Sequence, residues 1–241
     1  MSLMSLSRFL ADKKWRESLS MRLKDDIVKR FWTEEFAILP QRLAYDSLAP
    51  IQNKVGALIA NPTLRSIFEP AKSKLQLSNI LRNNKILLVN LSRGLLGLDG
   101  CVLLGSMLLS LLESVVLSRA ELPENSRAPF FLYVDEFSLF ANDGFVALLA
   151  EGRKYGLGVT LAQQGIASLD PKLQSDILTN TGTLISFRLG AHDAHLVEQQ
   201  LQPIYQSLHL MTLPAHQFAI RILIDGMAKN PFNGKTCGKG E

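Results

Sequence analysis

Apolar and charged residues alternate at helical spacing through the first third of the chain. In one stretch, apolar residues recur near every fourth position: Leu19, Leu23, Ile27, Phe31 and Phe36. This spacing places the apolar side chains on one face of a helix. Prolines at positions 40, 50, 62 and 70 divide the region into short helices. We therefore expect residues 1–82 to form an all-α segment that contains no strand.

The pattern changes at Lys85, where compact apolar runs begin to alternate with helical ones. Five runs have the composition of buried strands: residues 85–91, 130–137, 158–164, 183–189 and 217–225. Helices are expected between them, at residues 101–119, 143–155, 168–180 and 191–201. Alternating strands and helices are typical of a mainly parallel sheet covered on both faces. We expect this α/β fold over residues 83–230, followed by a glycine- and lysine-rich tail, 231–241, that is frayed.

Composition narrows the class of protein. Hydrophobic residues make up 47% of the chain and charged residues 20%, which is ordinary for a globular protein. Cys101 and Cys237 are too few for a disulfide framework, so a reducing compartment is expected. The first 20 residues carry charges throughout, unlike a secretory signal. The most apolar run, 101–117, is short and is interrupted by polar residues, so we expect a buried helix and no transmembrane segment.

The net charge of +4 is unevenly distributed. Residues 1–82 hold 14 Lys and Arg against 8 Asp and Glu, whereas residues 83–241 hold 12 against 14. A basic N-terminal third is compatible with a polyanionic partner, of which nucleic acid is the usual one. A solvated helical face has the same composition, and charge alone favours that simpler interpretation.

Two acids, Asp135 and Glu136, directly follow the apolar run that begins at Phe130. Ligands of parallel α/β sheets gather at the carboxyl ends of the strands. An acid pair there is the Walker B arrangement: the first acid holds Mg²⁺ through its water shell, and the second polarises the water that attacks a γ-phosphate. We expect both acids to lie at a buried edge of the sheet. Other strands end in acids that cap a helix or pair with a cation, so the motif alone leaves both interpretations open.

Further polar residues follow in an order that favours nucleotide chemistry. The run 158–164 ends in Gln163 and Gln164, where many P-loop ATPases place a γ-phosphate sensor. Arg153 lies just before this run, and Arg188 lies in the next one. An arginine at the rim of a sheet can stabilise transition-state charge on the nucleotide of a neighbouring subunit. Each arginine taken singly is better explained by a surface ion pair. The acids, amides and arginines in this order and spacing, however, are a more specific indication of a nucleotide site.

The segments FFLYVDEFSLFA, LLAEGRKYGLGVTLAQQ and TNTGTLISFRLGAHDAHLV resemble the DNA-translocating ATPases of the FtsK–HerA group. Within that group they are most similar to type IV secretion coupling proteins of the TraG/TraD conjugation type. The segments NKVGALIANPTLRSIF, KILLVNLSRGLLG and IDGMAKNPF extend the resemblance over nearly the whole chain. The resemblance implies a RecA-like P-loop ATPase fold, in which residues 1–82 correspond to a small all-α domain inserted between the P-loop and Walker B strands.

The same resemblance implies a hexameric ring that pumps DNA, with ATP and Mg²⁺ as cofactors. Asp135 would be the Mg²⁺ acid, Glu136 the catalytic acid and Gln164 the end of the sensor strand. Arg153 would be a finger that acts on a neighbouring subunit, and Arg188 a second basic candidate. Secretion-system or relaxosome proteins would be further partners. The location would be cytoplasmic, including the inner face of the membrane where other regions or partners attach the protein.

A complete P-loop is missing from the sequence. The motif G-x-x-x-x-G-K-[ST] must stand between a strand and a helix, so that backbone N–H groups can hold the phosphates. The chain contains Gly-Lys twice, at 234–235 and 238–239. The first pair would need a glycine where Lys229 stands, and the second is followed by Gly240 instead of Ser or Thr.

In coupling proteins the P-loop precedes the all-α insertion, so this chain is expected to correspond to a C-terminal part that lacks Walker A. We expect it neither to bind nucleotide tightly nor to hydrolyse ATP alone. The alternative is a non-catalytic remnant without a P-loop, which serves as a DNA-binding or protein-interaction module. A fragment, a split gene and a remnant all stay open as reasons for the missing half. The cargo, the strandedness of the DNA and the oligomeric state of this chain also stay open.

Two other candidate sites are weaker. His192 and His195 could supply two metal ligands from one helix, but no third ligand is near them in sequence. Asp193 between them is more simply a favourable partner of the helix dipole. A stand-alone metal-dependent hydrolase built on Asp135 and Glu136 would need a further acid cluster, and the sequence offers none.

Overall fold

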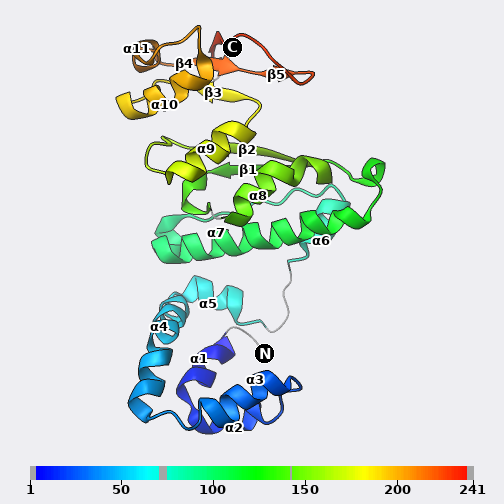
Figure 1. Ribbon diagram of the computed structural model, residues 1–241, viewed down its shortest axis with the longest axis vertical. Helices are drawn as coiled ribbons and strands as arrows, with labels where there is room; N and C mark the ends of the chain where they lie inside the picture. Colours follow the sequence, from blue (N-terminus) through cyan, green and yellow to red (C-terminus); the bar gives the residue numbers. More distant parts are fainter. Residues whose placement is uncertain (1–3, 71–74, 142, 238–241) are drawn as a thin grey trace. The chain divides into compact units, whose positions relative to one another are not determined.

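The computed structural model describes residues 4–70, 75–141 and 143–237 (Figure 1). Contacts divide the chain into two compact units. The first comprises Met1–Ile80 and Ile86–Gly105, and the second comprises Leu81–Lys85 and Ser106–Glu241. The first unit thus takes in about twenty residues beyond the helical segment that ends at residue 82.

The N-terminal part of the first unit consists of helices joined by short turns and loops in its described residues. Its elements are α1 (Met4–Ala11), α2 (Lys13–Ser20), α3 (Asp26–Arg30), the π-helix η1 (Phe31–Glu35), α4 (Gln41–Ala60) and α5 (Pro62–Phe68), with α6 (Leu77–Arg82) at the border of the unit. Leu10, Phe36 and Leu48 form a buried cluster, against which Phe9 and Trp32 pack. The aromatic rings at helical spacing therefore belong mainly to a core.

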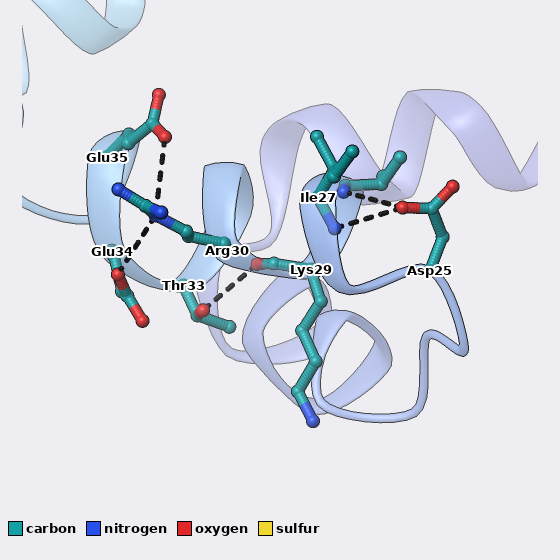
Figure 2. Close-up of polar contacts among 8 residues, drawn as sticks. Asp25, Ile27, Lys29, Arg30, Thr33, Glu34 and Glu35 are labelled. Carbon is teal, nitrogen blue, oxygen red and sulfur yellow. Dashed lines mark hydrogen bonds and ion pairs between the residues drawn. The ribbon is translucent and has the colours of Figure 1, made fainter.

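The junction of α3 and η1 shows how local hydrogen bonds set these helices (Figure 2). Asp25 begins α3, because its Oδ1 accepts the backbone N–H groups of Ile27 and Val28 at 3.0 and 3.1 Å. In η1, the N–H of Phe36 donates to the carbonyl of Phe31, five residues earlier, at 2.7 Å. An α-helix joins residues four apart, so this bond makes the turn one residue wider.

Ion pairs neutralise part of the positive charge of this unit. Arg30 lies 3.5 Å from Glu34 and 3.9 Å from Glu35 (Figure 2). Two further pairs join Arg8 to Asp12 and Lys13 to Glu17. All these side chains are exposed, so each pair contributes little to stability, but together they weaken the basic field that the composition implies.

The strand expected at residues 85–91 is absent from the structure, and this prediction is wrong. The segment has no regular secondary structure and pairs with no described strand, and Ile86 and Leu88 are 89% and 90% exposed. A strand exists only when a neighbour accepts its hydrogen bonds, and sequence composition does not provide that neighbour.

Helix α7 (Arg93–Leu117) begins earlier than expected and is interrupted at Gly97, which has φ 71° and ψ 168°. Only glycine adopts such a conformation without strain, so Gly97 permits the kink inside the helix. The helical stretch Arg93–Glu121 is long and apolar enough to cross a membrane by length and composition alone. Buried core helices pass the same test, so this finding places no part of the chain in a bilayer.

The second unit contains one parallel pair of strands. β1 (Phe130–Asp135) pairs with β2 (Leu157–Ala162) in a register that joins Phe130 to Leu157 and Asp135 to Ala162. The connection runs through η4 (Phe137–Leu139), α8 (Asp143–Glu151) and η5 (Gly152–Tyr155), as expected for a β-α-β crossover. Before β1 lie two short 3₁₀ turns, η2 (Ser118–Glu121) and η3 (Glu124–Ser126).

Only one face of this pair is covered. Phe131 and Tyr133 on β1 are 64% and 73% exposed, whereas Leu132 and Val134, which point to the other face, are half-buried. The expected sheet with helices on both faces is therefore not formed by the described residues. The exposed rings are unusual for a parallel sheet, which is normally buried on both sides.

The later strands are antiparallel, contrary to the expected mainly parallel sheet. β3 (Leu184–Ser186), β4 (Gln217–Arg221) and β7 (Phe232–Lys235) form one sheet in the order β3-β4-β7, and β5 (Leu223–Ile224) pairs with β6 (Met227–Ala228). Asp225 and Gly226 both have positive φ, 51° and 78°, as the tight turn of a two-residue hairpin requires. A short hairpin connection forces its strands to run antiparallel, and the Asp-Gly pair was the sequence signal for it.

Residues 232–235 form the strand β7, so the expected frayed tail is wrong for these residues. Residues 238–241 lie outside the described residues. In β7, Gly234 stands opposite Phe218, and a Cβ at position 234 would come within 2.2 Å of the Phe218 ring. The first Gly-Lys pair therefore lies in a strand, where close packing on an aromatic ring explains the glycine.

Three helices complete the second unit: α9 (Pro171–Asn180), α10 (Ala191–Leu201) and α11 (Ser207–Met211). Figure 1 shows α10 and α11 beside β3 and β4, and contacts join α10 to both α11 and β4. The core between them consists of Ala194, Val197, Leu201, Tyr205, Leu210, Leu213 and Ala219. We refer to α10, α11 and the β3-β4-β7 sheet as the C-terminal module.

Tyr205 links this core to the last strand. Its hydroxyl donates to Oδ1 of Asn233 at 2.5 Å, and burial raises the pKa of Tyr205 above its usual value. We expect Tyr205→Phe to lower the free energy of unfolding by about 1 kcal/mol, because the Asn233 oxygen loses its donor. The native state favours the protonated phenol, so this stability is complete below about pH 10 and declines as pH rises further.

Urea unfolding followed by circular dichroism at neutral and alkaline pH measures both effects. Tyr133→Phe, at an exposed tyrosine, is the control and is expected to change little. Equal stability of the wild type and Tyr205→Phe at neutral pH would contradict the prediction.

Candidate functional site

The two acids lie where the parallel strand β1 ends. Asp135 is the last residue of the strand, and its Oδ1 accepts the backbone N–H of Glu136 at 3.0 Å. Glu136 has the left-handed conformation, with φ 50° and ψ 46°. A non-glycine residue rarely adopts this conformation, and such strain is concentrated at functional sites. The sharp turn leads directly into η4, where the buried Phe137 anchors the chain.

The neighbouring strand brings an amide to the second acid. β2 ends at Ala162, opposite Asp135, so Gln163 and Gln164 leave the sheet beside the turn at Glu136. Nε2 of Gln164 donates to Oε1 of Glu136 at 2.5 Å. The structure therefore joins two of the residues selected from the sequence, although they lie 28 positions apart.

Gln163 makes a second connection that the sequence did not reveal. Its Oε1 accepts the backbone N–H of Ser138, in η4, at 3.3 Å. Both glutamines therefore bind the turn after β1. Gln163 binds the backbone of the turn at Ser138, and Gln164 binds the carboxylate of Glu136. The pair of amides at a strand end was visible in the sequence, but their division between two partners was not.

The acids are more accessible than expected. Asp135 is exposed and Glu136 is half-buried, so the prediction that both lie at a buried edge is wrong for Asp135. Asp135 points to the same face of β1 as Phe131 and Tyr133, which is the uncovered face. The residue is exposed to solvent, so its charge needs no compensating cation from the protein.

The donor set fits a hydrated Mg²⁺ better than a caged metal. Among the described residues, no group of three or more His, Cys, Asp or Glu side chains could hold a metal. Mg²⁺ keeps several waters and commonly uses one or two carboxylates plus the phosphates of its substrate. Asp135 can serve in that way. His192 and His195 are both exposed on α10, with no third ligand near them in the described part of the chain.

Arg153 lies at the other end of the strand pair. It belongs to η5, which precedes β2, whereas Glu136 and Gln164 follow the carboxyl ends of β1 and β2. A strand of six residues spans about 20 Å, so Arg153 does not approach the acids of its own chain. It is exposed, and a role on a neighbouring subunit stays a prediction.

Arg188 does not pair with the acids either. It follows β3, two residues after Ser186, instead of lying within the strand as expected. Its side chain is exposed and makes no ion pair with any residue in the described ranges. The structure therefore brings together Asp135, Glu136 and Gln164, but not the two arginines.

A buried arginine that the sequence analysis missed supports the turn that carries Arg153. Arg119 is only 6% exposed, and its Nη1 donates to the carbonyls of Ala128 and Tyr155 at 3.0 and 2.9 Å. From the opposite side, Arg127 donates to the carbonyl of Lys154 at 2.5 Å. A charged residue at the end of a long apolar helix was the sequence signal, and it does not identify carbonyl partners up to 38 residues away.

Comparisons with known proteins locate this arrangement among known folds. No family model matches the chain, and no curated protein sequence matches it. The bacterial conjugative coupling protein TrwBdeltaN70, in its unbound monoclinic form, is similar in structure, with a TM-score of 0.57 and 13% sequence identity over 90% of this chain and 56% of that one. At this identity the similarity shows the fold: the chain has the α/β fold of a conjugative coupling protein.

A second solved structure is more distant. The genome-packaging NTPase B204 from Sulfolobus turreted icosahedral virus 2, in complex with AMPPCP, matches with a TM-score of 0.39 and 16% identity, over 52% of this chain and 60% of that one. This similarity is too weak to support an argument. The chain spans less than two thirds of either structure.

Proposed function

We propose that this chain is the C-terminal segment of a hexameric DNA-translocating ATPase of the coupling-protein type, of the FtsK–HerA group. The observation that carries the proposal is the contact between Glu136 and Gln164 at the carboxyl ends of two parallel strands. In P-loop ATPases a carboxylate there orients the attacking water, and a polar residue on the next strand senses the γ-phosphate. The coupling-protein fold supports the same assignment.

The roles of the residues follow from their positions. Asp135 would bind Mg²⁺ through water, and Mg²⁺ bound with ATP would neutralise the phosphate charge. Glu136 would take the proton of the attacking water, while Gln164 keeps its carboxylate in place. Arg153 and Arg188 would act between subunits, because neither reaches the acids of its own chain. We propose that the phosphate-binding loop comes from sequence outside these 241 residues, because neither Gly-Lys pair satisfies the motif.

The test compares these 241 residues alone with the same residues fused to the coding sequence that precedes them. Mg²⁺-dependent ATP hydrolysis, stimulated by DNA, is expected from the fused form and not from the chain alone. Turnover by the chain alone, abolished by Glu136→Gln, would refute the assignment of the phosphate-binding loop to another segment. An upstream sequence without a glycine-rich GK[ST] motif, together with no hydrolysis, would contradict the ATPase proposal.

A second candidate function is a non-catalytic module that binds DNA or protein. The exposed rings of Phe131 and Tyr133 beside Asp135 favour it, because an uncovered aromatic face on a parallel sheet is a surface for a partner. In this case DNA or protein binding would persist without ATP, and substitution of Glu136 would have no effect on it.

DNA binding by the first unit makes a separate prediction. Lys14, Arg22 and Lys24 are exposed and make no ion pair in the described part of the chain, unlike Arg30. If these three side chains contact phosphates, replacing all three with Gln should reduce the slope of log affinity against log salt by about 3. Fluorescence anisotropy of a labelled oligonucleotide at several salt concentrations measures the slope.

The matched control is Arg30→Gln, because Glu34 and Glu35 already neutralise Arg30. It should change the slope by less than about 1. An unchanged slope in the triple variant would show that the basic residues form only a solvated face.

A further inference from the structure

The loop that follows Gln164 is held by a residue of the C-terminal module. Oδ1 of Asp193, in the first turn of α10, accepts the backbone N–H groups of Ile166 and Ala167 at 2.6 and 2.9 Å. A carboxylate that accepts two consecutive N–H groups makes two charge-assisted hydrogen bonds, which are stronger than neutral ones. The carboxylate of Asp193 is directed to the loop, although Asp193 lies in the first turn of its own helix.

The loop contains a glycine where Asp193 approaches it. A Cβ at Gly165 would come within 2.9 Å of Oδ2 and 3.2 Å of Oδ1 of Asp193. Any side chain at this position would displace either the carboxylate or the loop. The glycine directly after Gln164 is therefore explained by the close approach of Asp193.

A second, apolar contact joins the same loop to the same module. The side chain of Ile166 packs against the buried cluster that includes Ala194, Val197 and Leu201 of α10. The loop is thus attached by its backbone to the Asp193 carboxylate and by its side chain to the core beneath that helix. Both attachments lie within three residues of Gln164.

We infer that Asp193 is a positioning residue for the contact between Gln164 and Glu136. Gln164 is exposed, and its only hydrogen bond among the described residues is the one to Glu136. Fixing the next residues of its loop restricts the amide to the region of the carboxylate, and this lowers the entropy cost of forming the contact. The C-terminal module thereby determines the geometry at the carboxyl ends of the parallel strands.

The relevance of this contact to ATP hydrolysis rests on the proposed function, but the contact itself does not. If the proposal holds, a displacement of α10 would move Gln164 relative to Glu136. The Asp193 carboxylate and the Ile166 side chain would then connect the C-terminal module to the nucleotide site. Asp193 lies about 30 positions after Gln164 in the sequence.

The test is amide spectroscopy of the isotope-labelled chain without nucleotide. In Asp193→Ala, we expect the backbone amides of Ile166 and Ala167 to exchange with solvent at least about tenfold faster, because each loses its acceptor. We also expect the side-chain NH₂ signals of Gln164 to move toward the positions of a free amide. A cap that only stabilised α10 would not shift a side chain on another element.

Two further variants separate positioning from loss of folding. Asp193→Asn keeps an oxygen acceptor and should retain most of the wild-type Gln164 signal, whereas Gly165→Ala should displace it with Asp193 intact. The matched control is Asp25→Ala, since Asp25 also accepts two consecutive N–H groups with one oxygen but lies in the first unit (Figure 2). It should leave the Gln164 signals unchanged.

Gln164 NH₂ signals that coincide in the wild type, Asp193→Ala and Gly165→Ala would overturn the inference. A displaced Gln164 signal in both Asp193→Ala and Gly165→Ala supports the inference. If no form of the protein hydrolyses ATP, the proposed function fails but the inference about Asp193 stands. In a form that hydrolyses ATP, Asp193→Ala should lower kcat about tenfold or more with little change in KM, and Asp193→Asn should recover most of the loss.

Discussion

In a form of the protein that contains a phosphate-binding loop, Glu136→Gln slows ATP hydrolysis by at least about a hundredfold. Among the described residues, the carboxylate of Glu136 is the acidic group to which Gln164 donates, and an amide in its place cannot take a proton from the attacking water. The shape of the side chain is preserved, so ATP affinity should change little. The measurement is steady-state phosphate release, with ATP affinity determined separately by displacement of a fluorescent nucleotide.

Glu124→Gln is the control for this experiment. Glu124 is an exposed acid of the same unit, in η3, with no ion pair to any described residue. It should retain wild-type turnover. A Glu136→Gln protein with normal turnover would eliminate Glu136 as the catalytic acid and would favour the non-catalytic module.

Replacing Arg119 with Ala is expected to have the largest effect on stability, lowering the free energy of unfolding of the second unit by about 3 kcal/mol or more. The guanidinium is buried and donates to the carbonyls of Ala128 and Tyr155, with a longer contact of 3.4 Å to that of Leu81. Without it, these carbonyls lose their donors in a region that water does not reach freely, and a cavity is left.

The chain offers a convenient way to localise this loss. Both tryptophans, Trp15 and Trp32, belong to the first unit, so their fluorescence reports on that unit alone. Far-ultraviolet circular dichroism reports on both units. In Arg119→Ala the dichroism transition should move to lower urea concentration, while the fluorescence transition changes little.

Arg8→Ala is the matched control, because Arg8 forms an exposed pair with Asp12 at 3.6 Å, and such pairs contribute less than about 1 kcal/mol. Arg119→Lys should recover only part of the stability, since a lysine cannot reach several carbonyls with a planar fork. Equal stability of Arg119→Ala and the wild type would show that the three carbonyls find other partners.

The sequence predicted the helices with good accuracy. The run 191–201 forms α10 with the same bounds, and the run 143–155 forms α8 and η5. The described part of residues 1–82 contains no strand, as expected. Helical hydrogen bonds join residues three to five positions apart, so apolar periodicity and capping residues such as Asp25 contain most of the required information.

The strands show where that information ends. Residues 85–91 have strand composition but no partner, and β3 and β4 pair antiparallel although the alternation with helices indicated a parallel sheet. Pairing joins residues tens of positions apart, and composition does not specify which edges meet. The hairpin turn at Asp225 and Gly226 was a local signal for the antiparallel β5-β6 pair, but it does not specify how β3 and β4 pair.

The candidate site divides in the same way. The sequence alone determined that two acids end one apolar run and two amides end the next, and that neither Gly-Lys pair fits the phosphate-binding motif, because these are properties of consecutive residues. Only the tertiary structure decided that Gln164 donates to Glu136 and that Asp193 accepts the N–H groups of the loop beside Gln164. It also decided that Asp135 is exposed and that neither arginine pairs with the acids. The physical reason is that these contacts join groups about 25 to 30 residues apart in the sequence. Strand register and core packing set the distance between such groups, and a local sequence pattern does not.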